Sequence, residues 1–320
     1  MSKGRICPAP ELDPGREKEL EREPDPESNP DLLKDRFKEL ATDPRRSLSS
    51  PKTPWPARLS VEVEPGVRGG ILGRISRQGP LTVSRPFYAA DVLELALIHP
   101  PGGLVEGDDL RVDILARPAS RVLFTTTSAQ KVYRARDWQS QSINLTARGD
   151  GLEWLPRETI VFSGAKGRLS LWVDVEPTSR FIGWDLVNFG AGAEFSEGIL
   201  IQELTIKRAE RLVFRERARV SGGDRFLPSA LGYGGRSVAA SLWALGRAGA
   251  SDEDLLSQVA SKVPQNQKGA LTGITLRGGL LVARYLGSAM ERAWDWLETV
   301  WRAIRELWGG RLFRPRLWST

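Results

Sequence analysis

The sequence predicts a mainly β protein, with a large body of stacked antiparallel sheets in a β-helix-like arrangement and a smaller α+β C-terminal portion. Apolar and polar residues alternate between Leu59 and Val220, Gly and Pro interrupt this pattern every roughly 8 to 15 residues, and helical patterns begin only after Gly222. Strands with one apolar and one polar face are typical of antiparallel sheets packed in layers. No internal repeat of fixed length establishes a solenoid from the sequence alone.

Residues 1–57 differ in composition from the rest of the chain. They contain 11 Lys and Arg residues, 12 Asp and Glu residues, many prolines, and few β-branched or aromatic residues. Such a segment lacks the apolar surface needed to fold alone, so we expect a disordered or low-complexity N-terminal extension.

Residues 58–222 form the predicted β-rich body. Leu110, Val112 and Ile114 alternate with the charged residues Arg111 and Asp113, and the same period of two recurs further along the chain. Because successive side chains of a strand point to opposite faces, each of these segments is expected to present one face to a core and the other to solvent.

Residues 223–320 combine both kinds of pattern. Two apolar, strand-like runs cover Val238–Leu245 and Leu271–Tyr285, and a helical pattern begins near Ser251. The last helix is expected after Ser288, where apolar residues recur at helical spacing with three tryptophans beside them. Tryptophans at this spacing favour a packing role, so we predict an α+β portion packed on the body.

The composition limits the functions and compartments that the chain suits. Its single cysteine cannot form an internal disulfide, and no apolar run is long enough to span a membrane, so a cytoplasmic location is expected. The formal net charge is +6, but the basic residues are scattered rather than interleaved with aromatic residues. This distribution favours acidic protein partners and argues against nucleic acid.

Few side chains could support catalysis. His99, the only histidine, precedes two prolines, which favours a structural role over nucleophilic catalysis. The chain has no Cys/His cluster with metal-binding spacing and no phosphate-binding loop. Among the carboxylates, Asp185 stands out because bulky apolar residues flank it, and a buried charge needs a partner or a cation; Lys131 and Arg134 are candidate partners. A pair of carboxylates could instead serve a glycoside hydrolase.

A distinctive turn follows His99. Two prolines end a strand because proline offers the sheet no hydrogen-bond donor, and two glycines then permit a tight reversal within residues 100–103. The reversal brings Glu106, Asp108 and Asp109 into one short loop. These carboxylates could form an ordinary solvated hairpin tip, or they could line a polar path for a cation.

Several motifs around this turn resemble those of a known family. In order they read Gly-Pro-Leu-Thr-Val (79–83), Arg-Pro-Phe-Tyr (85–88), His-Pro-Pro-Gly-Gly-Leu-Val (99–105), Thr-Thr-Ser-Ala-Gln-Lys-Val-Tyr-Arg (126–134), Leu-Glu-Trp-Leu-Pro-Arg-Glu-Thr (152–159), Phe-Ile-Gly-Trp-Asp (181–185) and Pro-Arg-Leu-Trp-Ser-Thr (315–320). From about residue 59 to its end, the chain resembles the urease accessory protein D family, UreD, also called UreH in some bacteria. No single motif is decisive, but together they are highly specific.

The resemblance implies both a fold and a role. Members of that family have a mostly β body with helices near the C-terminal end. They are non-enzymatic scaffolds that bind apo-urease and, with accessory proteins F and G, deliver nickel to it, and a water-filled passage is thought to carry the ion. No tightly bound cofactor is implied. One histidine and one cysteine suit such a conduit, because oxygen ligands release nickel more readily than imidazoles or thiolates.

The matching positions imply candidate site residues. By this resemblance, Asp108 and Asp185 act as transient oxygen ligands on the nickel route, while Ser128, Lys131 and Glu158 line the passage. Two alternatives remain open at this point: a purely structural assembly chaperone whose acidic residues do not carry nickel, and the carboxylate-based glycoside hydrolase.

Overall fold

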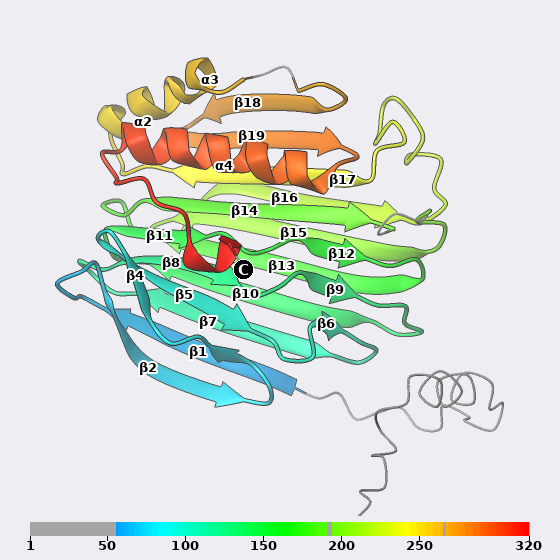
Figure 1. Cartoon of the computed structure of the whole chain (residues 1–320), viewed down its shortest axis with the longest axis horizontal. Helices are drawn as coiled ribbons and strands as arrows, with labels where there is room; N and C mark the ends of the chain where they lie inside the picture. The colour runs from blue at the N-terminus through cyan, green and yellow to red at the C-terminus, as the bar shows by residue number, and fades with distance from the viewer. Residues whose placement is uncertain (1–55, 191–193, 265–266, 320) are drawn as a thin grey trace, which may run out of the picture. The chain divides into compact units, whose positions relative to one another are not determined.

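The computed structural model describes residues 56–190, 194–264 and 267–319. These residues belong to one compact unit, which contains two β-sheets and a helical layer (Figure 1). The extension predicted for residues 1–57 lies outside the described residues except for its last two, which begin strand β1 (Pro56–Glu64). A proline can open a strand because its missing N–H is tolerated at the first position.

The first sheet, sheet A, has seven strands. In spatial order they are β16 (Arg211–Ser221), β15 (Gly198–Arg208), β13 (Ala165–Val175), β10 (Gln139–Ala147), β7 (Asp109–Ala116), β1 and β2 (Ile71–Gln78).

The second sheet, sheet B, has twelve strands among the described residues. Its main path is β18 (Leu271–Arg277), β19 (Leu280–Gly287), β17 (Val238–Leu245), β14 (Phe181–Phe189), β11 (Gly151–Trp154), β8 (Arg121–Thr126), β5 (Val92–Ile98) and β3 (Thr82–Val83). A branch from β14 contains β12 (Thr159–Val161), β9 (Gln130–Val132) and β6 (Gly103–Leu104), and β4 (Phe87–Ala89) pairs with β5.

Parallel pairing in the centre of both sheets corrects the predicted antiparallel body. Strands β1, β7, β10, β13 and β15 pair in parallel in sheet A, as do β5, β8, β11 and β14 in sheet B. The chain passes from β7 to β8 and β9 and returns to sheet A at β10, so successive circuits stack strands on both sheets, as in a β-helix. Period-two alternation shows which face of a strand is buried, but not the direction of its neighbour. The mainly β, stacked-sheet class is confirmed, and antiparallel pairs occur only towards the sheet ends of the described region.

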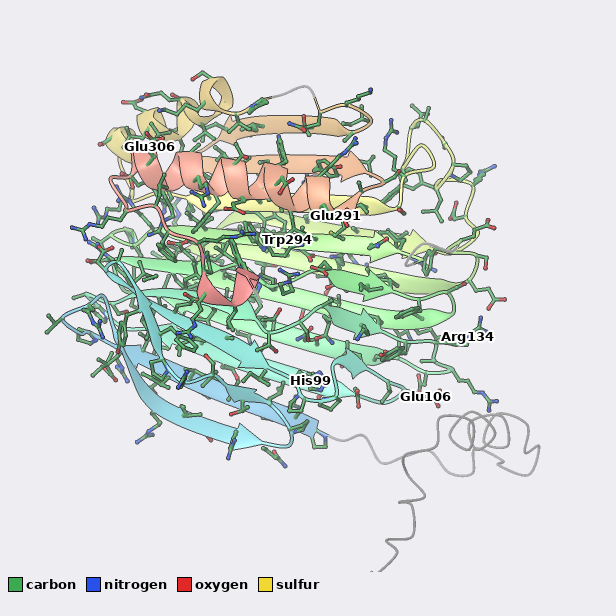
Figure 2. The ribbon with its side chains drawn as sticks, in the orientation of Figure 1. His99, Glu106, Arg134, Glu291, Trp294 and Glu306 are labelled. Carbon is green, nitrogen blue, oxygen red and sulfur yellow. The ribbon has the colours of Figure 1, made fainter. Side chains whose placement is uncertain are left out.

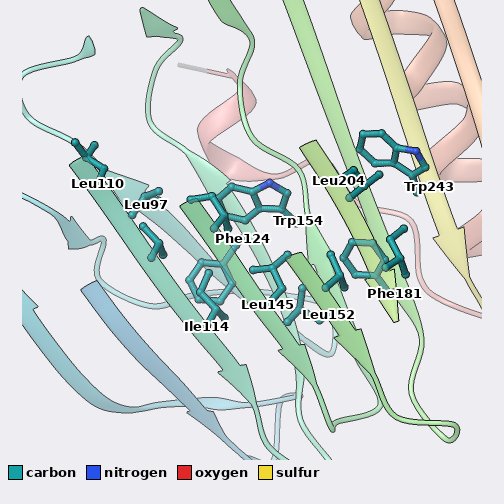
Figure 3. Close-up of a cluster of buried hydrophobic side chains, with 14 of the residues drawn as sticks. Leu97, Leu110, Ile114, Phe124, Leu145, Leu152, Trp154, Phe181, Leu204 and Trp243 are labelled. Carbon is teal, nitrogen blue, oxygen red and sulfur yellow. The ribbon is translucent and has the colours of Figure 1, made fainter. Parts of the chain in front are cut away.

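Apolar side chains from the inner faces of the two sheets form the main core. Leu110 and Ile114 of β7 and Leu145 of β10 lie in the same cluster as Phe124 of β8 and Leu152 of β11 (Figure 3). Burial of each such side chain stabilises the fold by roughly 1.5–3 kcal/mol. This core holds the two sheets together around the cavity described below.

A second core lies on the opposite face of sheet B. Here the strands pack against α2 (Ala250–Ser257), α3 (Val259–Lys262), α4 (Met290–Leu307) and the 3-10 helix Arg316–Ser319, and Trp296 and Trp301 of α4 are fully buried. The expected last helix and both apolar strand runs are therefore present, and the tryptophans of α4 serve packing. No helix in the described residues is both long and apolar enough to cross a membrane.

Candidate functional site

A cavity that is partly open to solvent lies between the two sheets. Its volume is about 190 Å³, and strands β10, β13, β15 and β16 of sheet A line it together with β14 and β17 of sheet B. Its polar wall residues are Thr126, Gln130, Gln141, Arg157, Thr159, Ser170, Asp185, Gln202, Glu203, Glu216, Tyr233, Ser241 and Arg284. The rest of the lining is apolar and includes Ile143, Trp154 and Leu204. A space of this size can hold several water molecules, and a hydrated ion inside it would meet oxygen atoms on the polar part of the walls.

Asp185 lies where sheet B divides into two rows of short strands. Strand β14 pairs with β11 through Phe181–Gly183 and with β12 through Val187–Phe189, and Asp185 falls between these two stretches. On its other side, Asp185 lies beside Ser241 of β17. The division of the sheet therefore leaves space next to Asp185, and the cavity occupies it.

The carboxylate of Asp185 has a neutral hydrogen-bond donor but no cation beside it. The side-chain amide of Gln202 donates a hydrogen bond to Asp185 Oδ2, and no ion pair involves Asp185 among the described residues. Burial raises the pKa of Asp185 to about 6; hydrogen bonds from the Leu186 backbone and Gln202 oppose this shift, and the charge of Glu216 adds to it. A cation near Asp185 would favour its ionised form.

Tyr233, Glu216 and Arg284 form the polar end of the cavity nearest the last strands. The ion pair between Glu216 Oε1 and Arg284 Nη2, at 2.9 Å, links β16 of sheet A with β19 of sheet B. Burial, together with the charges of Glu216 and Asp185, raises the pKa of Tyr233 to about 12, so its hydroxyl stays protonated. Asp185, Ser241 and Arg284 form a row across three neighbouring strands.

Of the five predicted site residues, only Asp185 lines the cavity. Asp108 lies in the turn before β7, where its carboxylate accepts a hydrogen bond from the backbone N–H of Val105 at 2.9 Å. Ser128 is exposed, and Lys131 is partly buried on β9. The structure does not bring these residues together with Asp185.

Glu158, the fifth predicted residue, contacts the helical layer. Its carboxylate accepts a hydrogen bond at 3.0 Å from the indole N–H of Trp294 of α4, which is labelled in Figure 2. Trp294 also packs edge-on against Trp184, with ring centroids 5.2 Å apart. Glu158 thus helps hold α4 against sheet B.

Other carboxylates have clear structural partners. Glu153 accepts a 2.6 Å hydrogen bond from the indole of Trp301 and pairs with the buried guanidinium of Arg305. Asp109 pairs with Arg58 at 2.6 Å, which joins neighbouring strands of sheet A. These pairs set Asp185 apart, because its hydrogen-bond donors are uncharged.

Gln202 and Glu216 were not predicted as site residues. Both interrupt apolar series on inner strand faces, Gln202 between Leu200 and Leu204 of β15, and Glu216 after Phe214 of β16. A polar residue within an inward-facing series is a sequence signal that could have identified them. No group of three or more His, Cys, Asp or Glu residues is placed to hold a metal within the described ranges.

The sequence of the described unit is similar to those of known proteins. A family model described as UreD urease accessory protein matches residues 56–319. The urease accessory protein UreD of Pseudomonas paraeruginosa is 38% identical over 276 residues, covering 83% of this chain and 95% of the relative. UreD of Azoarcus sp. is 36% identical over 283 residues, covering 86% of this chain and 98% of the relative. Urease accessory protein UreD 1 of Psychrobacter cryohalolentis is 31% identical over 281 residues, covering 83% of this chain and 91% of the relative.

Proposed function

Because the chain belongs to the UreD family of urease accessory proteins, we propose that it is a urease maturation factor that conducts nickel through the cavity between its sheets. In this proposal it binds apo-urease and accessory proteins F and G in the cytoplasm. The relatives are named accessory proteins, which agrees with the predicted non-enzymatic role and leaves the glycoside hydrolase alternative without support. Nickel is cargo here, not a resident cofactor.

The carboxylate of Asp185 is the observation that carries this proposal. It is partly buried, faces the cavity and has no cationic partner among the described residues, so a passing divalent cation would offset its desolvation. The amide oxygen of Gln202, the hydroxyl of Ser241 and the carboxylate of Glu216 add further oxygen atoms to the same walls. Such oxygen ligands bind Ni²⁺ more weakly than nitrogen or sulfur ligands, which suits an ion that must leave.

The roles of the other predicted residues stay predictions. Ser128, Lys131 and Glu158 are not among the residues that line the cavity, and a ligand role for Asp108 would require a separate position on the route at the turn before β7. Asp185 is therefore the residue on which the proposal is tested first.

The test is co-expression of this chain with the urease structural subunits and accessory proteins F and G, comparing wild type with Asp185→Asn. A pull-down reports complex formation, and metal analysis reports the nickel content of the urease. Asp113→Asn is the matched control, because Asp113 pairs with Arg111 at 3.1 Å and accepts a 2.7 Å hydrogen bond from Asn144 without lining the cavity. We expect the Asp185 variant to form the complex but leave urease deficient in nickel, and the control to behave as wild type.

A purely structural assembly chaperone is the second candidate. The pairing of Glu153 with Arg305 and of Asp109 with Arg58 favours it, since these acidic residues stabilise the fold. Normal nickel content with Asp185→Asn, in a complex that still forms, would support the chaperone and exclude the passage through Asp185. If wild type captures no partner and urease acquires nickel without it, both proposals fail.

A further inference from the structure

A groove runs beside the last strand of sheet A, where sheet B extends past it. We call it the basic groove; it has a volume of about 740 Å³, and it is lined by Leu212–Arg215 of β16 and by residues of β18, β19 and the turn between them. The ion pair between Glu216 and Arg284 joins β16 to β19 at one side of this groove. Strand β18 lies beyond β19, at the end of sheet B.

Only one face of β18 and β19 is covered by the helical layer. Ile274 and Leu276 of β18 and Leu281 and Ala283 of β19 pack in the core with α4, which Figure 1 shows lying across β17 and β19. The alternate residues of both strands point to the opposite face, and it is these that line the basic groove. The groove is therefore a sheet face that sheet A leaves uncovered.

The floor of the basic groove is apolar. Leu212 is 61% exposed, and Val213, Phe214 and Val282 are only partly buried. Apolar side chains that keep part of their surface exposed beside an unpaired strand edge favour an interaction surface. Strand β16 pairs only with β15 among the described strands, so its outer edge can also accept an added strand.

Arginines surround this apolar floor. Arg215 and Arg277 line the groove, and neither side chain has an ion-pair partner among the described residues. Arg284 also lines it, but pairs with Glu216. An apolar floor with a basic rim complements a protein segment that presents apolar side chains on one face and carboxylates beside them, and it fits a nucleic-acid backbone poorly.

We propose that the basic groove is the docking site for an acidic amphipathic segment of a partner protein. Its carboxylates face Arg215 and Arg277, and its apolar side chains cover Leu212 and Phe214. Arg284 lines both the groove and the cavity between the sheets, so the docked segment lies next to that cavity. A role of the docked segment in nickel transfer rests on the proposed function. The docking itself does not depend on that function.

Charge reversal at the groove tests the docking. The variant Arg215→Glu/Arg277→Glu is compared with Arg74→Glu/Arg77→Glu, which makes the same change of charge on the exposed strand β2 at the other end of sheet A. Binding of each full-length variant to purified apo-urease, to accessory protein F and to accessory protein G is measured separately at two salt concentrations. We expect the groove variant to bind one of these proteins about tenfold more weakly, with a reduced dependence on salt, and the β2 variant to bind as wild type.

A second variant tests the apolar floor. Leu212→Asp changes a side chain that is already exposed, so it should fold as wild type, which circular dichroism checks, and yet should weaken binding to the same partner. Unchanged binding of all three proteins by both groove variants would overturn the docking proposal, as would an equal loss in the β2 variant. The nickel measurement with Asp185→Asn separates the two proposals. If Asp185→Asn blocks nickel transfer while the groove variants bind normally, only the docking proposal fails. If the groove variants lose binding while Asp185→Asn transfers nickel normally, only the passage through Asp185 fails.

Discussion

Asp185 should make the folded protein less stable at neutral pH than in mild acid, and asparagine at this position should remove that effect. Its pKa is raised from an ordinary value of 3.8 to about 6, mainly by burial. Between these pH values the folded state holds a proton that the unfolded state has released, so the free energy of unfolding falls as the pH rises. At about 1.4 kcal/mol per pH unit, the shift from 3.8 to about 6 corresponds to about 3 kcal/mol.

Urea denaturation between about pH 4 and pH 8 measures this effect. The Asp185→Asn variant should match wild type near pH 4 and exceed it by up to about 3 kcal/mol above pH 7, where folded wild type carries the buried charge. Asp109→Asn is the opposite control: the hydrogen bond from Arg58 lowers the pKa of Asp109, so its stabilisation is present at neutral pH and is lost as the pH falls through the folded pKa. A difference between wild type and Asp185→Asn that stays constant across the range would refute the burial argument.

Two further variants test what holds the helical layer on sheet B. Arg305→Met leaves Glu153 without its cation and should lower the free energy of unfolding by about 3–5 kcal/mol in urea denaturation. The double variant Arg305→Met/Glu153→Gln should recover part of this loss. An unchanged free energy of unfolding in Arg305→Met would contradict the reasoning. Trp318→Ala removes a ring stacked 5.2 Å from Trp184 and a 3.2 Å hydrogen bond to Thr125, and should destabilise the protein by about 3–5 kcal/mol in thermal denaturation. A loss below about 1 kcal/mol would show that the surrounding side chains close the gap.

The strands were readable from the sequence, whereas their pairing was not. The alternation predicted at residues 110–116 appears as β7, with Leu110, Val112 and Ile114 buried. Strand direction depends on where the chain goes after each strand, and here it crosses to the other sheet. Leu110 lies beside Gln141, and Gln141 beside Leu169, so successive circuits take 31 and 28 residues. Corners of unequal length explain why no fixed repeat is visible in the sequence.

A residue of the candidate site could be predicted only where its neighbours in the sequence indicate that its side chain lies inside the fold. Asp185 is flanked by bulky apolar residues on a strand, and the structure places it on the cavity wall. Asp108 was chosen from a turn motif, yet its carboxylate bonds to the backbone of that same turn. Gln202 and Glu216 reach the cavity from β15 and β16 of sheet A, the two strands that follow β14, and only the packing of sheet A against sheet B brings them to Asp185.

The contrast between Glu153 and Asp185 supports a transport role for the second residue. Both are enclosed carboxylates in sheet B, and burial raises the pKa of each. Glu153 has the guanidinium of Arg305 beside it, so the protein itself balances that charge. Asp185 receives hydrogen bonds only from an amide side chain and a backbone N–H, and Glu216 adds further negative charge nearby. A carboxylate in this position lowers stability at neutral pH and gains from any cation in the cavity, which is the property that a route for a divalent ion requires.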